Sequence, residues 1–177
     1  TIPEFSVTDA KVVTNSVNRS DNYMIINKGS RHGITEGMGV LTEKGVVGLV
    51  REVNTNYSLV MTLLHRQMRL SAAIQSNNYF GSLVWEGRDP YMGRLEHIPK
   101  HARPVSRDTI VTSGYSLIFP PDIKVGVVDT SWLDPTSNFQ EIKVRYFEDL
   151  GSVRRVYVVW NKDQKEQNEL LQAAANE

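Results

Sequence analysis

Short apolar runs separated by turn residues recur along most of the chain. Polar or Pro/Gly-containing segments divide the candidate strands, which lie at residues 23–26, 46–53, 58–63, 70–74, 81–86 and 92–97. Apolar residues take every second position in two places, on one strand face formed by Met68, Leu70, Ala72 and Ile74, and on another formed by Ile142, Val144 and Tyr146. A half-buried strand has this two-residue period. Short strands at near-regular spacing are typical of all-β barrels.

The stretch 109–128 predicts two further strands joined by a rigid corner. Residues 109–112 are all β-branched and favour an extended backbone. Pro120 and Pro121 lack a backbone N–H and cannot occupy a central strand, so we expect the segment between the two strands to form the corner. Gly126 lies inside the second apolar run, where a glycine marks a bulge or a close backbone approach.

The two ends of the chain are more polar than its middle. Residues 1–22 are polar and rich in turn residues apart from residues 10–13, and the Asn, Ser and Asp residues between 15 and 22 predict a loop. Residues 156–160 form a continuous apolar run, which is expected of a strand that is covered on both faces or lies at an interface. Beyond this run, Leu170 and Leu171 are the only large apolar residues of the tail, so we expect a frayed helix or disorder.

Two glycine-containing motifs resemble those of the rod shape-determining protein MreC family. The first is an NKG-x-x-x-G-I opening with a later GVVGLV run, which includes Asn27, Lys28, Gly29, Gly33, Ile34 and Gly48. The second has a TSG element, an FP pair and a VG-V element in that order: Thr112, Ser113, Gly114, Phe119, Pro120, Val125, Gly126 and Val128. The family usually has a glycine after the proline-rich corner, where this chain has Asp122. We expect structural roles for the motif residues.

An internal repeat indicates two related subdomains. Residues 39–42 and 47–50 parallel residues 109–112 and 125–128, and a later apolar run follows each copy. We therefore expect an all-β fold of two small six-stranded β-barrels with a frayed or disordered C-terminal tail, and the resemblance to MreC implies the same architecture. The expected subdomains are a first barrel of residues 7–64 with 113–160, a central barrel of residues 65–112, and a polar tail of residues 161–177.

Composition argues against a nucleic-acid partner and against sites built from cysteine. The 177 residues carry 20 basic and 20 acidic side chains, so no positive excess favours nucleic acid as a partner. The chain has no cysteine, and therefore no disulfide and no Cys-based zinc site. It also has no apolar run of about 18 residues that could span a membrane as a helix. The resemblance to MreC implies a fragment that reaches the membrane only through an anchor outside this sequence.

A few residues raise a catalytic or a metal-binding alternative. Ser113 lies in a paired-barrel pattern with four histidines, as in protease-like hydrolases, but no G-x-S-x-G setting surrounds it. His97 and His101 have the spacing of metal ligands on a helix, but Pro99 between them breaks such a helix. The glycine-rich region contains no phosphate-binding motif. We expect a protein that is not an enzyme and has no cofactor or metal, with a hydrolase as the alternative.

Function is then expected to lie in contacts with other proteins. Aromatic residues are enriched at interface hot spots, and the candidate partner-binding residues are Tyr79, Tyr91 and Tyr115. The resemblance to MreC implies a scaffold of the bacterial cell-wall elongation machinery, which maintains cell shape by binding peptidoglycan synthases. The implied partners are a penicillin-binding transpeptidase, the membrane protein MreD and further copies of the scaffold. The implied location is the periplasmic or extracellular side of the bacterial inner membrane, with an N-terminal anchoring helix and a coiled coil outside this sequence.

Overall fold

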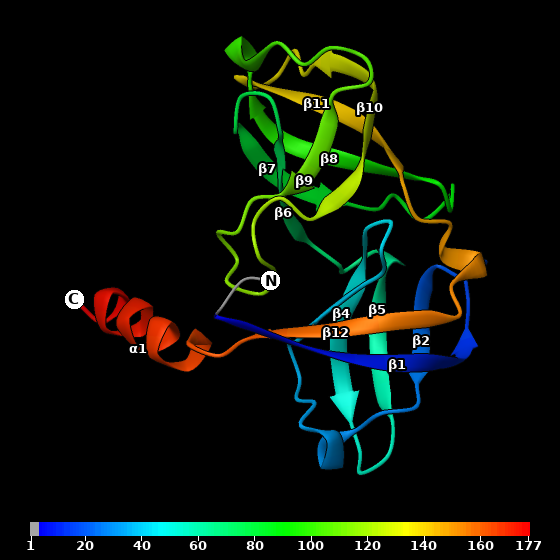
Figure 1. Cartoon of the computed structure of the whole chain (residues 1–177). Coiled ribbons are helices and arrows are strands. Elements are labelled where there is room, and N and C mark those ends of the chain that lie inside the picture. Colours follow the sequence, from blue (N-terminus) through cyan, green and yellow to red (C-terminus); the bar gives the residue numbers. More distant parts are fainter. Residues whose placement is uncertain (1–3) are drawn as a thin grey trace.

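The computed structural model describes residues 4–177, which form two β-barrels and a C-terminal helix (Figure 1). The first strands in chain order are β1 (Phe5–Asn15), β2 (Asp21–Ile26), β3 (Gly39–Leu41), β4 (Val46–Val53) and β5 (Ser58–His65). Then follow β6 (Leu70–Ile74), β7 (Phe80–Val84), β8 (Met92–Pro99), β9 (Thr109–Thr112), β10 (Lys124–Leu133) and β11 (Phe139–Tyr146). The last elements are β12 (Arg155–Asn161) and helix α1 (Gln164–Ala175), and short 3₁₀ turns occur at Ser30–His32, Lys100–Ala102 and Leu150–Ser152.

Each barrel is a closed sheet of six antiparallel strands. The first closes in the order β1-β12-β3-β4-β5-β2, and the second in the order β10-β11-β8-β7-β6-β9. Strand β12 returns to the first barrel only after β6 to β11 have formed the second. The second barrel is therefore an insertion in the chain between β5 and β12, and Figure 1 shows it stacked on one end of the first.

The predicted architecture of two six-stranded barrels is confirmed, but the subdomain boundaries differ from the expected ones. Residues 113–160 were expected in the first barrel, yet β10 and β11 within this segment pair with β9 and β8 in the second. The expected central barrel of residues 65–112 contains only four strands, β6 to β9. Four strands would leave two unpaired sheet edges, and β10 and β11 fill that gap by pairing with both edges and with each other.

Side-chain alternation positions the core of the second barrel. Both sets of alternating apolar residues that the sequence places on one strand face are buried. The first set is Met68, Leu70, Ala72 and Ile74, and the second is Ile142, Val144 and Tyr146. Strands β4 and β6 also have the predicted bounds. In both, the apolar positions stop where the strand ends and a polar residue follows. These strands are the part of the fold that local pattern determines most directly.

Both ends of the chain form regular structure. Strand β1 occupies residues 5–15, in a stretch that the sequence indicates to be polar and turn-rich apart from residues 10–13, and residues 1–3 of that stretch lie outside the described residues. Only Ala10 of this strand is fully buried, whereas Val7 and Val13 point to solvent, so the usual amphipathic pattern is missing. The polar tail forms helix α1, and no residue of this helix is buried.

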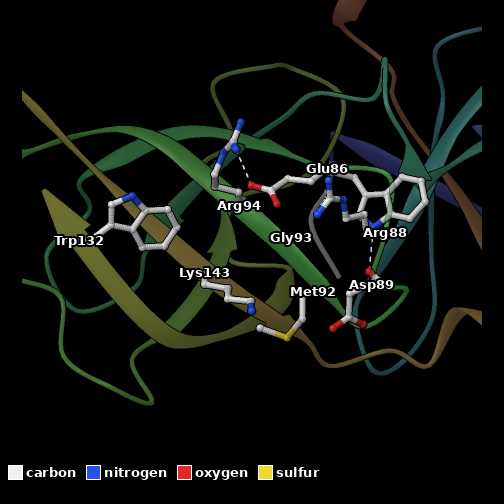
Figure 2. A pocket seen from close by; sticks show the side chains of 9 residues that line it. Glu86, Arg88, Asp89, Met92, Gly93, Arg94, Trp132 and Lys143 are labelled. Atoms are coloured by element: carbon white, nitrogen blue, oxygen red, sulfur yellow. Dashed lines mark hydrogen bonds and ion pairs between the residues drawn. The ribbon is translucent and has the colours of Figure 1, made fainter. Parts of the chain in front are cut away.

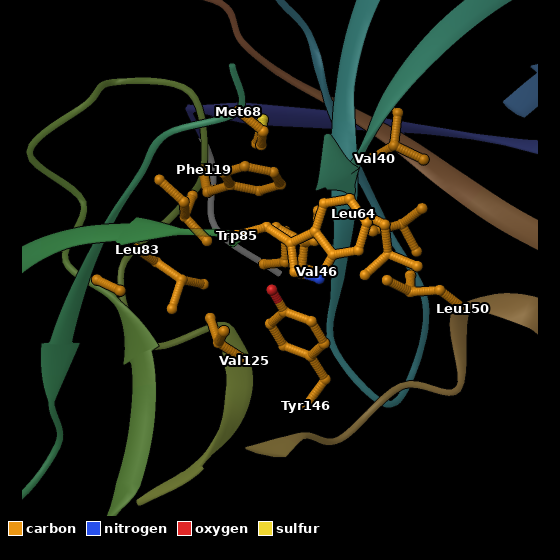
Figure 3. Close-up of a cluster of buried hydrophobic side chains, with 14 of the residues drawn as sticks. Val40, Val46, Leu64, Met68, Leu83, Trp85, Phe119, Val125, Tyr146 and Leu150 are labelled. Atoms are coloured by element: carbon orange, nitrogen blue, oxygen red, sulfur yellow. The ribbon is translucent and has the colours of Figure 1, made fainter. Parts of the chain in front are cut away.

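One hydrophobic cluster extends through both barrels and their junction. Figure 3 shows Trp85, Val125 and Tyr146 of the second barrel beside Val46 and Leu64 of the first. Burial in this cluster raises the pKa of Tyr146, and the nearby carboxylate of Asp89 adds to the effect, so the hydroxyl stays protonated. Because the cluster is continuous, the barrels are packed against each other as one unit.

Two glycines allow neighbouring strands to approach closely. A Cβ added at Gly48 would overlap the carbonyl oxygen of Met61, and one added at Gly126 would overlap that of Arg145. The pairing register between β9 and β10 also shifts between Lys124 and Gly126. Gly126 therefore lies at a bulge and at a close backbone approach, as its position between valines predicts.

Candidate functional site

An open apolar groove lies on the outer surface of the first barrel. It has a volume of about 360 Å³, and its seven lining residues are Phe5, Val7, Leu41, Pro120, Ile123, Tyr157 and Val159. All seven are uncharged. The side chain of Val7 is 55% exposed, so the groove opens to solvent along β1. We refer to these seven residues as the apolar groove.

Strand register explains why these side chains meet. Val7 on β1 lies directly opposite Val159 on β12, and Tyr157 on β12 lies directly opposite Leu41 on β3. Directly opposite residues of an antiparallel pair point to the same face of the sheet, and so do residues two positions apart. Three strands that are distant in sequence therefore contribute apolar side chains to one outward-facing strip.

The connector between β9 and β10, residues 113–123, forms the other wall of the groove. It crosses the outside of the first barrel, where the ring of Phe119 covers Gly39, and a Cβ added at Gly39 would lie 2.5 Å from the nearest atom of that ring. Phe119 is only 1% exposed, whereas the adjacent Pro120 lines the groove. Gly39, which lies opposite Val159, thus leaves room for the ring of Phe119, and this ring holds the connector in place.

Hydrogen bonds fix both ends of this connector. The Thr112 hydroxyl donates to the carbonyl oxygen of Pro120 at 2.6 Å and accepts from the backbone N–H of Ile123 at 2.9 Å. The amide of Asn161, at the end of β12, donates to the carbonyl oxygen of Leu117 at 3.3 Å. The connector is therefore tied to the second barrel through Thr112 and to the first barrel through Asn161.

The remaining motif residues lie in turns. Gly114 has a φ of +82° directly after Ser113, which only glycine adopts readily, and it packs against Pro121. In the first motif, Gly33 has a φ of +85° at the end of the 3₁₀ turn Ser30–His32. Gly29, at the start of that turn, lies against the backbone of residues 54–57.

Ser113 is bonded to structural partners. Its hydroxyl lies 2.6 Å from the hydroxyl of Ser71 and accepts from the backbone N–H of Tyr115 at 3.1 Å. These bonds join the start of the connector to β6, and they place the serine in the turn rather than beside a histidine base. The two histidines of the metal alternative are also separate, since His97 contacts the ring of Phe139 and His101 that of Tyr79.

Replacing Ser113 with alanine is expected to lower the free energy of unfolding by about 1 kcal/mol, because one hydrogen-bonded hydroxyl pair is lost. We also expect that a serine-reactive phosphonate leaves the folded wild-type chain unlabelled. Thermal unfolding of the variant and mass spectrometry of the treated wild type provide the two measurements. Covalent labelling of Ser113 in the folded chain would support the hydrolase alternative instead.

The three candidate tyrosines lie apart from the groove. Tyr115 is 70% exposed, and its ring packs against Phe80 with the ring centroids 4.7 Å apart. Tyr79 is half-buried and packs against the core and His101. Tyr91 is exposed just before β8, whereas Phe80 begins β7, so the antiparallel pairing of these strands puts the two residues toward opposite ends of the hairpin. The three tyrosines therefore do not form one surface.

Sequence reasoning missed most of the groove. Phe5 and Val7 lie in a segment that the sequence indicates to be polar and turn-rich, and Leu41 and Ile123 stand in runs that gave no sign of an outward face. The one useful signal was the continuous apolar run 156–160, which predicts a strand covered on both faces or at an interface. Tyr157 and Val159 of that run line the groove.

Across residues 4–177, no three His, Asp or Glu side chains are placed to hold a metal ion together. Within the same residues, no helix has both the length and the apolar character needed to cross a membrane.

The two closed barrels and the connector that ties them together define an all-β double-barrel domain. A sequence model described as "Rod shape-determining protein MreC, barrel core" matches residues 12–160. The chain belongs to this MreC family, as the two motifs predict.

Curated relatives carry the name cell shape-determining protein MreC. The protein of Escherichia coli (strain K12) is 29% identical over 164 residues, which cover 90% of this chain and 44% of the relative. That of Caulobacter vibrioides (strain NA1000 / CB15N) is 29% identical over 169 residues, which cover 92% and 45%. The chain thus spans about half the length of the curated relatives it matches.

Solved MreC structures share the fold. MreC of Listeria monocytogenes superposes with a TM-score of 0.83 at 25% identity, over 92% of this chain and 79% of that one. MreC of Pseudomonas aeruginosa gives 0.78 at 21% identity, over 86% and 98%. MreC in a complex with penicillin-binding protein PBP2 from Helicobacter pylori gives 0.72 at 15% identity, over 89% and 99%.

Proposed function

We propose that this chain is the partner-binding part of a non-catalytic scaffold in the bacterial cell-wall elongation machinery, and that the apolar groove receives a penicillin-binding transpeptidase. The observation that carries the proposal is the groove itself, whose seven lining residues are uncharged and which opens to solvent beside Val7. Contiguous exposed apolar surface on a folded domain marks an interaction site. Such a surface gains free energy when a partner covers it.

Family membership supports the role, and the Helicobacter pylori structure supports the choice of partner. That MreC has the same fold and is in a complex with the transpeptidase-class protein PBP2. In the present chain both barrels are closed, so neither offers a free strand edge to which a partner could add a strand. The partner must therefore insert apolar side chains between the connector and strands β1, β3 and β12.

Replacing Val7 with aspartate is expected to weaken transpeptidase binding at least tenfold. The complex would bury a carboxylate without a partner in an apolar site, which costs more than the lost contact alone. A tenfold loss corresponds to about 1.4 kcal/mol. Isothermal titration calorimetry with the extracytoplasmic part of the transpeptidase from the same organism measures the change.

Val13→Asp is the matched control for this experiment. Val13 lies on the same strand and is 53% exposed, against 55% for Val7, but it does not line the groove. We expect this variant to bind as the wild type does. Equal binding by Val7→Asp and Val13→Asp would exclude the groove as the contact site.

We also propose that the anchored protein binds further copies of itself and MreD, on the outer side of the inner membrane. Anchoring raises the effective concentration of partners, so these contacts can be weak in the isolated domain. Photoreactive residues at Tyr79, Tyr91 and Tyr115, and at Val7 for comparison, in the membrane-anchored protein test these positions in cells. Capture of a synthase, MreD or a second copy supports them as contact residues, whereas capture at Val7 alone confines partner binding to the groove.

A further inference from the structure

A second pocket, on the outside of the second barrel, combines an exposed tryptophan with paired charged side chains. It has a volume of about 450 Å³, within the usual range of about 300–1,000 Å³ for small-molecule sites. Figure 2 shows Arg94 and Glu86 along one side, Lys143 and Met92 along the other, and Trp132 at one end. The apolar groove lies on the other barrel, so the two sites are separate.

Strand register explains why these side chains project outward together. Lys143 on β11 lies directly opposite Arg94 on β8, and Trp132 on β10 lies directly opposite Glu141 on β11. Glu141 and Lys143 are two positions apart, so all four residues share the outer face of a three-stranded surface. The flanking residues Ile142 and Val144 point into the barrel core and make this surface rigid.

The polar side chains in this pocket are held in place by one another. The Arg94 guanidinium donates to a carboxylate oxygen of Glu86 and, at 2.7 Å, to one of Glu96. Its Nε is buried and has no hydrogen-bond partner within residues 4–177. Arg94 therefore holds the carboxylates of Glu86 and Glu96 in place through charge-assisted hydrogen bonds, and the remaining carboxylate lone pairs can accept from ligand hydroxyl groups.

The charges of the pocket favour a neutral ligand. Arg88, Arg94 and Lys143 are cationic, whereas Glu86, Asp89 and the adjoining Glu96 and Glu141 are acidic, so the pocket carries charges of both signs. A phosphate or an acidic peptide would be attracted by the cationic side chains and repelled by the carboxylates. Hydroxyl groups both donate and accept, so a ligand rich in hydroxyls can use both sets.

The aromatic side chains supply the remaining feature. Trp132 is 44% exposed on a rigid strand, and its indole face can receive the apolar face of a sugar ring. Trp85 is buried at the base of the pocket, and its indole N–H donates to the carbonyl oxygen of Asp89 at 2.8 Å, which fixes the loop after β7. A flat aromatic surface beside a rim of hydrogen-bonding groups matches the two sides of a pyranose.

We propose that this pocket binds a short stretch of a neutral, hydroxyl-rich glycan, with a sugar ring stacked on Trp132 and its hydroxyls bonded to Arg94 and Glu86. Identifying that glycan as the sugar backbone of the cell-wall strand, between its charged peptides, rests on the proposed function, whereas the sugar chemistry rests on the pocket alone. The scaffold would then hold the polymer beside the enzyme that crosslinks it. The site would be weak and would act through repeated contacts along the strand.

Titration of the whole chain with chitotetraose, a tetramer of N-acetylglucosamine, tests the proposal. We expect a dissociation constant on the order of 1 mM, as a single small exposed site allows, with shifts of the Trp132 indole N–H signal in nuclear magnetic resonance spectra. Trp132→Ala should weaken binding at least tenfold. Leu133→Ala is the matched control, because Leu133 is the next residue on β10, is 58% exposed and does not line the pocket.

The outcomes separate this site from the proposed scaffold role. Trp132→Ala should keep the wild-type affinity for the transpeptidase, while Val7→Asp should keep the wild-type affinity for chitotetraose. No binding of chitotetraose by the wild type at millimolar concentration, or equal binding by Trp132→Ala, overturns the glycan site whatever the transpeptidase result. Shifts at Trp132 caused by the transpeptidase and not by chitotetraose overturn it as well, because they would make the pocket a protein contact.

Discussion

Replacing Gly126 with valine is expected to lower the free energy of unfolding by about 3 kcal/mol, at the upper end of the usual cost of overpacking. The added Cβ would overlap the carbonyl oxygen of Arg145 and come within 2.9 Å of its carbonyl carbon. Backbone atoms in a closed barrel cannot move aside as the end of a flexible side chain can, so β10 would have to separate from β11. For a chain of this size the melting temperature should fall by roughly 6–12 °C.

Gly151→Ala is the control for this prediction. The nearest atom to a Cβ at Gly151 is an oxygen of Asp149 at 3.6 Å, an ordinary contact, and the backbone there is not left-handed. We expect a change within about 0.5 kcal/mol, as for most surface substitutions. Differential scanning calorimetry of both variants gives the comparison, and a Gly126→Val melting temperature equal to that of the wild type would refute the close-approach explanation.

Replacing Phe119 with alanine is expected to cost about 3–5 kcal/mol, as for other fully buried phenylalanines. The ring covers Gly39 of the first barrel, but it belongs to the connector that leaves and re-enters the second. Its removal would create a cavity at the junction and release one wall of the apolar groove. We therefore expect lower stability together with weaker transpeptidase binding.

Urea unfolding followed by tryptophan fluorescence measures the stability of the Phe119→Ala variant. Phe139→Ala is the control, because Phe139 is an exposed residue whose ring packs at right angles to another exposed side chain, His97. Its loss should change the free energy of unfolding by less than about 1 kcal/mol. Equal effects of the two substitutions would mean that Phe119 does not join the barrels.

Local sequence pattern predicted the strands whose apolar positions face a core. The residues from Leu70 to Ile74 form a strand with the predicted bounds, and all but Ser71 are buried. The sequence did not predict strand β1, because its polar Ser6 and Thr8 are half-buried while its apolar Val7 is exposed and faces the groove. In a typical half-buried strand the apolar residues are the buried ones. A period of two indicates which face is apolar but not what covers that face.

Pairing between distant strands was the part that the sequence could not predict. The repeat of residues 39–50 in residues 109–128 correctly indicated two barrels, but it gave no information on which barrel receives β10 and β11. Their partners β9 and β8 are determined by how the sheet closes, which is a property of the whole second barrel. The groove could not be predicted for the same reason, since it combines β1, β3, β12 and the connector.

The insertion of the second barrel has a consequence for the order of folding. All strands of the second barrel lie in one continuous segment, whereas the first barrel needs β12 to join β1 and β3. The pair Val7–Val159 links residues from nearly opposite ends of the chain. Contacts of such high contact order form late, because the entropy of closing a long loop must be overcome before they are made.

During synthesis, which begins at the N-terminus, the edges of β1 and β3 that pair with β12 therefore stay unpaired until β12 has been made. Strand β12 closes the sheet and in the same step supplies Tyr157 and Val159 to the groove. A nascent or truncated chain that lacks this strand presents no complete groove. Under the proposed function, the transpeptidase would therefore find the complete groove only on chains in which β12 has joined β1 and β3.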